Sequence, residues 1–584
     1  MEDKGRIGLT ITKLIVGGFK SIRERTEIPI APLTLLFGPN SAGKSAVLAA
    51  LDELSKKLIE KPSDESSLMR AIRDFLAVQS NAHQYPPKAG EDEPSRSHVT
   101  LGLEIDSFPS GETSFDGNID EARRMALDLY KALDGSTLRL EFIEAGARFV
   151  STVSIDGQKL VEFVDAATYL EANPSGADSP DQDTKRGLLG KHLIRNDRWG
   201  ALVLQTDHPF WANSELASMF AKLRRLTSGS LDSFAQEAVA IEVDGGGVVI
   251  RTASDLFHAH GWGDQQQFDR SLRDVYTHGA AGESAETTSV RTKLLEATLV
   301  VDLICASVSF LVYQMRFIAH KELEFARVVG DRKVLADEDL TTEFDLPHSG
   351  DLGGPQLHDY AAWLGVLRAG DDIASAEVMT AVRERDDFIN DTLRHDFFPA
   401  RGYQVKPEVW QITTTRLLDR DPAQSGDGSE RLKVSLFLED ANGRVLDFSE
   451  VGSGVSYVLP VLVSLWGADR SWIEQPELHL HPAAQCELGD VAIRAFNRGR
   501  FSIIETHSEH LLLRVLRRIR QTSNGTANDP ELKCRPEAVS ILYFEPLPDG
   551  STKVRPIRVS RGGDFMDRWP QGFFSERDRE LLDE

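Results

Sequence analysis

The chain has 584 residues, too many for one ordinary hydrophobic core, so two or more globular units are expected. Hydrophobic residues make up 41% of the sequence and charged residues 27%, which is typical of a globular chain and excludes a disordered or fibrous one. The formal net charge of −25 argues against a surface built for nonspecific DNA binding, because neutralising phosphates requires clustered Lys and Arg.

Three further features narrow the class of protein. The cysteines Cys305, Cys486 and Cys534 stand far apart without CxxC spacing, which argues against a disulfide scaffold or a thiolate zinc site. The first residues are charged and lack the apolar core of a secretory signal. The most apolar run, residues 303–315, is shorter than the roughly 20 residues that a membrane span needs, and predicts a buried helix leading into a strand. We therefore expect a cytoplasmic protein without membrane spans.

The first 50 residues predict strand, strand, loop and helix. Residues 9–19 alternate in polarity, residues 33–37 ("LTLLF") form a short apolar strand, and residues 46–58 carry apolar side chains at helical spacing. Between the second strand and the helix lies "GPNSAGKS", which satisfies the phosphate-loop pattern GxxxxGK[ST] in its required context.

Each residue of this loop is a candidate for binding nucleotide. The candidates are Gly38, Pro39, Asn40, Ser41, Ala42, Gly43, Lys44 and Ser45. Small residues let backbone N–H groups approach phosphate oxygens, and the helix N-terminus adds a favourable dipole. The pattern places Lys44 at the β- and γ-phosphates and the Ser45 hydroxyl on Mg²⁺. No guanine-reading NKxD element follows, so ATP is favoured over GTP as the ligand.

The middle of the chain predicts an inserted α/β region. Strands are expected at residues 99–105, 138–146, 147–155 and 240–252, helices at 121–133 and 217–226, and breaker segments at 171–183 and 277–289. Residues after 317 are expected to be mostly helical to about 400, followed by strands around 434–440. No internal repeat and no sustained heptads occur, so long coiled-coil arms are not encoded.

A second anion site is predicted near the other end of the chain. Gly452, Ser453 and Gly454 precede an apolar helix and leave its first backbone amides uncovered, without a lysine of their own. This pattern makes sense if the helix start of one copy closes over the γ-phosphate held by the other copy, so that a symmetric pair buries two nucleotides. An ordinary helix cap is the alternative interpretation.

Downstream, one apolar strand ends at Glu474 and another at His507. The segments read "VGSGVSYVLP", "EQPELHLHP", "ETHSEHLLLR" and, at residues 569–574, "WPQGFF". In this order they resemble the ABC-type ATPases of the OLD/RecF/SMC-head kind, and in particular a bacterial subgroup, often called AAA ATPases, with ExPELHLHP and C-terminal WPxGFF motifs. The resemblance covers residues 1 to about 55 and about 440 to 584.

The resemblance implies an α/β fold: an ABC-type P-loop ATPase head, with a mixed sheet core and helices, interrupted by an inserted α/β arm. Residues 1–60 and 305–584 would form the head and residues 61–304 the arm. It also implies a homodimer or higher homo-oligomer that closes around ATP and Mg²⁺. Because relatives include the Gabija and PARIS ATPases, it implies a sensor in antiphage defence with a partner effector. Only 77 residues follow His507, too few for the Toprim nuclease domain of some relatives.

The resemblance also assigns roles at the acidic motif. Glu474 takes the place of the Mg²⁺ carboxylate, His507 that of the γ-phosphate sensor, and Gln475 that of the general base. An amide cannot usefully accept a proton, so hydrolysis is expected to be slow. Glu477 is either a replacement base or a structural acceptor for backbone amides. Gln314, placed after an expected strand, is a candidate for the glutamine that links Mg²⁺ to the inserted part.

Other motifs leave alternatives open. His479 and His481, like His258 and His260, lie two residues apart, but without a third ligand neither pair predicts a zinc site, and "HLHP" is better interpreted as a segment that meets the partner subunit. The arginines of residues 514–520 form either a basic patch or a solvated helix face. Direct DNA binding by the closed dimer, as in a RecF-type repair ATPase, is the alternative function.

Overall fold

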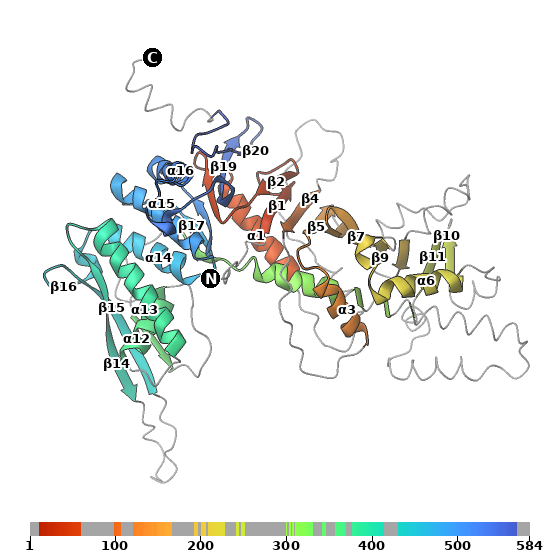
Figure 1. Cartoon of the computed structure of the whole chain (residues 1–584), viewed down its shortest axis with the longest axis horizontal. Coiled ribbons are helices and arrows are strands. Elements are labelled where there is room, and N and C mark those ends of the chain that lie inside the picture. The colour runs from red at the N-terminus through yellow and green to blue at the C-terminus, as the bar shows by residue number, and fades with distance from the viewer. Residues whose placement is uncertain are drawn as a thin grey trace, which may run out of the picture. The chain divides into compact units, whose positions relative to one another are not determined.

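The computed structural model describes most of the chain, in segments. They are residues 11–59, 98–106, 121–145, 148–165, 192–196, 200–205, 208–227, 241–244, 247–251, 300, 303–304, 307–308, 310–330, 341–345, 357–369, 376–413 and 430–568. The chain divides into two compact units (Figure 1). The first unit comprises Met1–Leu9, Pro29–Lys44 and Glu324–Glu584, and the second comprises Thr10–Ile28 and Ser45–Leu323.

The first unit is built on a six-stranded sheet with the order β12-β17-β18-β3-β19-β20. Its strands are β3 Leu33–Phe37, β12 Ala326–Val328, β17 Arg470–Glu474, β18 Phe501–Glu505, β19 Val539–Pro546 and β20 Thr552–Pro556. The first five in this order are parallel, and β20 pairs antiparallel with β19. Their apolar runs suit strands covered on both faces. Because parallel strands end at one edge, the ends of β3, β17 and β18 meet there.

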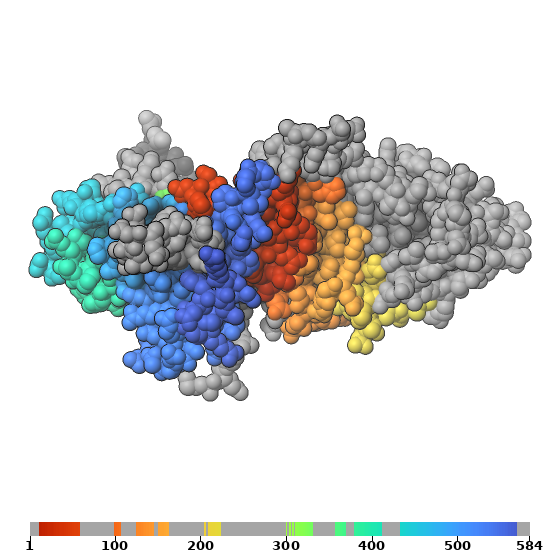
Figure 2. Space-filling view, turned by 90° about the horizontal axis from the view of Figure 1, so that it is seen from above, coloured from red at the N-terminus to blue at the C-terminus, as the bar shows by residue number. Residues whose placement is uncertain are grey.

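Three helices accompany this sheet, and two of them, α14 and α15, pack against its strands (Figure 1). They are α14 Ser453–Gly467, α15 Pro482–Asn497 and α16 Glu509–Ser523. Side chains from the sheet and from all three helices share one hydrophobic core, with Leu35, Val458, Ile473 and Leu511 fully buried. In the space-filling view, the C-terminal residues in shades of blue form one continuous body (Figure 2).

A smaller antiparallel sheet belongs to the same unit. It consists of β13 Thr341–Asp345, β14 Gln404–Thr413, β15 Glu430–Glu439 and β16 Val445–Leu446. The helices beside it are α12 Leu357–Ala369 and α13 Ala376–Asp391, followed by a π-helical turn at Thr392–Phe397. The prediction of mostly helical structure to about residue 400 is confirmed for α12 and α13 but is wrong for β12 and β13. Long β14 pairs along its whole length with β15 and gains its strand conformation from that partner.

The second unit contains a ten-stranded sheet with the order β10-β11-β8-β9-β7-β6-β5-β4-β1-β2. The strands are β1 Ile11–Gly17, β2 Thr26–Pro29, β4 Val99–Ile105, β5 Leu138–Ala145, β6 Arg148–Ile155, β7 Gln158–Asp165, β8 His192–Asn196, β9 Gly200–Gln205, β10 Ile241–Asp244 and β11 Gly247–Arg251. The helices are α1 Lys44–Ile59, α3 Glu121–Lys131 and α6 Glu215–Thr227, with a 3-10 turn at Pro209–Trp211. Residues 310–321 are also helical.

The strands and helices predicted for the middle of the chain are confirmed in type, and the α/β class holds for both units. The run at 240–252 forms two strands, β10 and β11, that pair antiparallel. The unit boundaries differ from the expected positions at residues 60 and 304. Residues 10–28 cluster with the inserted part because β1 pairs with β4 in the same sheet.

The described residues bear on the expectations about membrane spans and about cysteines. No helix in these segments has the length and the apolar run that crossing a membrane requires. Cys486 and Cys534 are both free thiols, and Cys305 lies outside the described residues.

Candidate functional site

The phosphate loop joins β3 to α1, as the sequence pattern predicts. Three of its residues have left-handed backbone conformations: Gly38 with φ 149°, Ser41 with φ 62° and Gly43 with φ 89°. A Cβ atom at Gly38 would lie 2.6 Å from the carbonyl oxygen of Phe544 in β19, so only glycine fits there. A loop that mixes right- and left-handed residues can turn successive N–H groups to one side, as a phosphate requires.

Lys44 is held inside this loop by acceptors of its own chain. Its side chain is 4% exposed, and Nζ donates to the carbonyl oxygens of Gly38 at 3.0 Å and Pro39 at 2.9 Å. The same Nζ lies 3.5 Å from Oε1 of Glu505. Burial lowers the pKa of Lys44, while the negative charges of Glu505 and Glu477 oppose the shift. The amine is therefore placed at the loop before any phosphate arrives.

Two carboxylates stand at the ends of adjacent strands next to Lys44. β17 ends at Glu474 and β18 at Glu505, and these residues are direct partners in the parallel ladder. Oε2 of Glu474 accepts the backbone N–H of Gly330 at 3.0 Å. Burial raises the pKa of Glu505. The positive charge of Lys44 opposes this shift, and the negative charge of Glu474 adds to it. Sequence reasoning missed both Glu505 and Gly330. The signal for Glu505 was its place at the end of the strand that leads to His507.

Gln475 directly follows β17 in a left-handed conformation, with φ 46°. Its backbone N–H donates to the carbonyl oxygen of Glu505 at 2.6 Å, which fixes the residue at the end of the strands. The side-chain Oε1 would lie 3.3 Å from a Cβ atom at Gly330. An amide, not a carboxylate, therefore stands beside Glu474 at this edge of the sheet.

Glu477 is occupied by contacts of its own. It is 9% exposed; Oε2 accepts the Thr506 hydroxyl at 2.8 Å and Oε1 accepts the backbone N–H of His507 at 2.7 Å. Both oxygens therefore tie the turn after β17 to the end of β18. This geometry favours the structural interpretation of Glu477. It differs from the expectation in one respect: the backbone amide that donates to Glu477 belongs to the end of the neighbouring strand and not to the turn that contains Glu477.

His507 has a fixed backbone and an imidazole with an unused nitrogen. Its Nε2 atom is buried and has no hydrogen-bond partner among the described residues. Burial is the larger cause and the positive charge of Lys44 the smaller cause of a pKa of His507 below its ordinary value, so the ring is neutral at pH 7. A buried ring nitrogen without a partner costs free energy, which an arriving phosphate oxygen would recover.

The glycine-rich helix start has the open N-terminus that the sequence predicts. Gly452 caps α14 with φ −59° and ψ 144°, and no side chain accepts from the first amides of the helix. Gly452 is exposed, and a Cβ atom there would meet nothing within 4 Å. At Gly454 a Cβ atom would lie 3.1 Å from the carbonyl oxygen of His479, so packing within one chain explains that glycine. The fold of a single chain does not require a glycine at 452.

Gln314 does not follow a strand. Residues 310–321 are helical, so the position on which its assignment rested is wrong. The apolar residues before Gln314 continue at helical spacing instead of forming an extended segment. The strand comes later, as β12, and the residue that reaches Glu474 after it is Gly330.

The histidines of "HLHP" have structural contacts. His481 caps α15, and its Nδ1 accepts the backbone N–H of Ala483 at 3.3 Å. His479 is exposed, has φ 60° and packs on the ring of Tyr457 at 4.4 Å between centroids. No group of three or more candidate metal ligands occurs within the described segments. His258, His260 and the WPQGFF segment lie outside the described residues.

The arginine-rich face of α16 is largely neutralised by carboxylates. Arg514 pairs with Glu487 and Asp490, and Arg518 pairs with the same Asp490. Arg520 pairs with Asp564 at 3.0 Å. This pairing favours a structural role for the helix face over a basic patch that binds phosphates.

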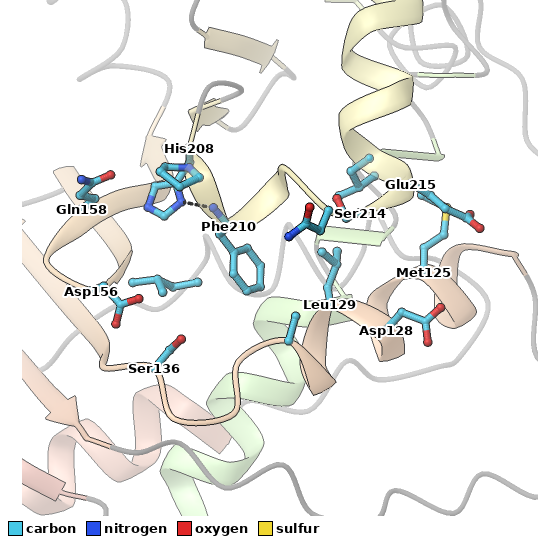
Figure 3. Close-up of a pocket in the computed structure, with 15 residues that line it drawn as sticks. Met125, Asp128, Leu129, Ser136, Asp156, Gln158, His208, Phe210, Ser214 and Glu215 are labelled. Atoms are coloured by element: carbon cyan, nitrogen blue, oxygen red, sulfur yellow. Dashed lines mark hydrogen bonds between the residues drawn. The ribbon is translucent and has the colours of Figure 1, made fainter.

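A separate cavity of about 510 Å³ lies in the second unit (Figure 3). Apolar side chains of α3, such as Leu129, and Phe210 of the 3-10 turn line it together with three carboxylates. Each carboxylate has a neighbour of its own. Asp128 lies 3.8 Å from Lys131, Glu215 lies 3.5 Å from Arg124, and Asp156 accepts the backbone N–H of Thr137 at 2.9 Å.

Comparisons with known proteins bear on the first unit. Residues 356–514 match the family described as "AAA domain, putative AbiEii toxin, Type IV TA system". No curated protein matches the chain. Together with the phosphate-loop geometry, the family match supports a P-loop ATPase of the ABC or AAA type.

Solved structures give more distant likenesses. The chain is 12% identical to an Smc head domain from Pyrococcus furiosus bound to the C-terminal domain of ScpA, with 98% of each chain covered and a TM-score of 0.31. An Smc head from Pyrococcus yayanosii is also 12% identical, over 98% of this chain and 100% of that one, with a TM-score of 0.33. The SMC head from Thermotoga maritima is 10% identical, over 94% and 100%, with a TM-score of 0.26.

Proposed function

We propose that the first unit binds and slowly hydrolyses ATP, and that two copies close around two ATP–Mg²⁺ to signal to a partner effector. The observation that carries the proposal is the meeting of three strand ends. β3 leads into the phosphate loop with Lys44, β17 presents Glu474, and β18 leads to His507. This arrangement offers a cation, a metal-binding carboxylate and a neutral imidazole to one phosphate chain.

The residues present fit ATP and Mg²⁺. The buried Nε2 atom of His507 has no partner in the described structure, and Lys44 points its ammonium group at loop carbonyls that a phosphate can replace. The Ser45 hydroxyl and the Glu474 carboxylate would hold Mg²⁺, since hard oxygen ligands suit this ion. Bound Mg²⁺ would offset negative charge on the phosphates. Gln314 loses its support as a metal ligand because it lies in a helix.

The proposal of a homodimer is based on the start of α14 at Gly452. Gly452 has free space around it and leaves the N-terminus of α14 without a side-chain cap, which does not stabilise a single chain. The open backbone amides are, however, suited to binding an anion. The γ-phosphate bound to the loop of a second copy has the required charge. The symmetric pairing gives each copy both roles.

Slow hydrolysis follows from the acidic motif. Gln475 can orient a water by hydrogen bonding but cannot take its proton. Glu477 has the required carboxylate, but both of its oxygens already accept hydrogen bonds. A site with these groups suits a nucleotide-dependent switch better than a fast motor.

The cellular role is proposed from resemblance. The motifs resemble those of the OLD-like ATPases, whose Gabija and PARIS members act in antiphage defence with an effector, and the matched family is named for a toxin and a TA system. Direct DNA binding of the RecF kind gains little support from α16, because three of the four arginines in residues 514–520 pair with carboxylates. We therefore propose a defence sensor with a protein effector.

ATP turnover by the purified chain tests the central proposal. We expect slow Mg²⁺-dependent turnover and ATP binding by the natural chain, and loss of both in Lys44→Ala, because the ammonium group supplies charge that no neighbour replaces. The thermal unfolding of both proteins serves as the control for folding. Equal turnover and equal ATP binding by the natural chain and Lys44→Ala would rule out an ATPase site at this loop.

A further inference from the structure

We propose that Glu505 competes with the nucleotide phosphates for Lys44 and thereby sets a low ATP affinity for the single chain. This inference rests on the proposed ATP site and adds a residue to which neither the sequence motifs nor the comparisons assign a role. Its consequence is that firm ATP binding depends on closure by a second copy.

The first step of the argument is the position of the carboxylate. Oε1 of Glu505 lies 3.5 Å from Nζ of Lys44, and the Glu505 side chain is 12% exposed. The ammonium group carries three N–H donors, and it has three acceptors nearby: Glu505 and the carbonyl oxygens of Gly38 and Pro39. A phosphate that binds Lys44 must therefore displace or share acceptors that are already in place.

The second step is the balance of charge. Glu474 on β17, Glu477 in the following turn and Glu505 on β18 all act electrostatically on one another or on Lys44. Lys44 on α1 is the cation among them, because His507 is neutral at pH 7. A triphosphate thus meets three carboxyl groups and one ammonium group at this edge of the sheet. Mg²⁺ and the N-terminus of a partner's α14 would offset the negative charge of the phosphates.

The third step separates Glu505 from its two neighbours. Both oxygens of Glu477 accept hydrogen bonds, from Thr506 and His507, so this residue holds the fold of the site together. Glu474 accepts from Gly330 on the side of β12, away from β3 in the strand order, and is the carboxylate proposed for Mg²⁺. Glu505 stands on β18, between β17 and β3, and faces the lysine of the phosphate loop. Its contact suits competition for Lys44 better than metal binding or support of the fold.

The size of the effect follows from Coulomb's law. The interaction that a freed Lys44 ammonium group would make with a phosphate about 6 Å away, at an effective dielectric constant of about 20, corresponds to a factor on the order of 100 in affinity. Since Lys44 loses a partner that helps to place it, we expect a net gain of about tenfold. Glu505→Gln removes the charge but keeps the size of the side chain, and Glu505→Asp keeps the charge at a greater distance.

The experiment measures ATP–Mg²⁺ affinity by titration calorimetry on the full chain, at concentrations where it stays monomeric. Glu505→Gln should tighten binding about tenfold and Glu505→Asp by less. Glu537→Gln, at an exposed carboxylate in the 3-10 turn Pro536–Ala538, is the charge-matched control and should leave affinity unchanged. In the Lys44→Ala background, where ATP binding is expected to be lost, Glu505→Gln should not restore it, because the carboxylate acts through the ammonium group.

Weaker ATP binding by Glu505→Gln, or a higher Mg²⁺ concentration for half-saturation, would overturn the proposal in favour of a framework or metal-binding role. Restoration of ATP binding by Glu505→Gln in the Lys44→Ala background would also overturn it. If Glu505→Gln fails to fold, Glu505→Asp decides the matter: tighter ATP binding supports the proposal, and unchanged or weaker binding overturns it. Failure of the natural chain to bind ATP any better than Lys44→Ala is a different result, which refutes the ATP site itself.

Discussion

Replacing Gly452 by aspartate should separate the stability of one chain from the assembly of two. Gly452 is the N-cap of α14, no side chain caps the helix, and a new Cβ atom meets nothing within 4 Å. Aspartate is a strong N-cap, and its charge suits the positive end of the helix dipole. We expect Gly452→Asp to stabilise the folded chain by a few tenths of a kcal/mol, up to about 1 kcal/mol.

The same charge should oppose ATP-driven dimerisation. A γ-phosphate seated on the open amides of α14 would face the new carboxylate. Two unit charges about 5 Å apart, at an effective dielectric constant of about 20, repel by about 3 kcal/mol. The symmetric dimer contains this contact twice, so the two together weaken association by a factor on the order of 10⁴. The substitution should therefore raise the unfolding temperature slightly and still abolish most of the dimer.

Asparagine provides the matched control, because Gly452→Asn has nearly the same shape and capping ability without the charge. Sedimentation velocity with and without ATP–Mg²⁺ measures the dimer, and differential scanning calorimetry measures stability. The expected order of ATP-dependent dimer is natural chain, then Asn, then Asp, with Asp far below the others. Equal dimerisation by the Asn and Asp variants would refute the idea that α14 receives a phosphate from a second copy.

Two further predictions concern the acidic motif and the thiols. Gln475→Glu should raise single-turnover ATP hydrolysis if water activation limits the rate, since it supplies a proton acceptor beside Glu474; unchanged or lower turnover would instead implicate Glu477 as the base. Burial raises the pKa of Cys534 from 9.0 to about 12, so its thiolate is scarce at pH 8 and iodoacetamide should modify half-buried Cys486 first, as read by peptide mass spectrometry. Faster modification of Cys534 in the folded protein would contradict its burial.

The sequence by itself determined the local parts of the site. "LTLLF", "GPNSAGKS" and the helix after it specify a strand, a phosphate loop and a helix through residues that are neighbours in the chain. Glycine at 38 and 43 allows the left-handed backbone that the loop adopts. The uncapped start of α14 follows from Gly452 in the same way. Such features depend on side-chain size and backbone freedom, which a short stretch of sequence states directly.

Only the tertiary structure decided which distant residues meet around Lys44. The sheet order places β18 between β3 and β17. That order brings Glu505 close to Lys44 and places Glu474 beside Glu505 in the parallel ladder. Neither periodicity nor motif spacing encodes the order of strands, because it results from how their buried faces pack with the helices of the same core. For the same reason the two hydrogen bonds that occupy Glu477, and the approach of Gly330 to Glu474, could not be predicted from the sequence.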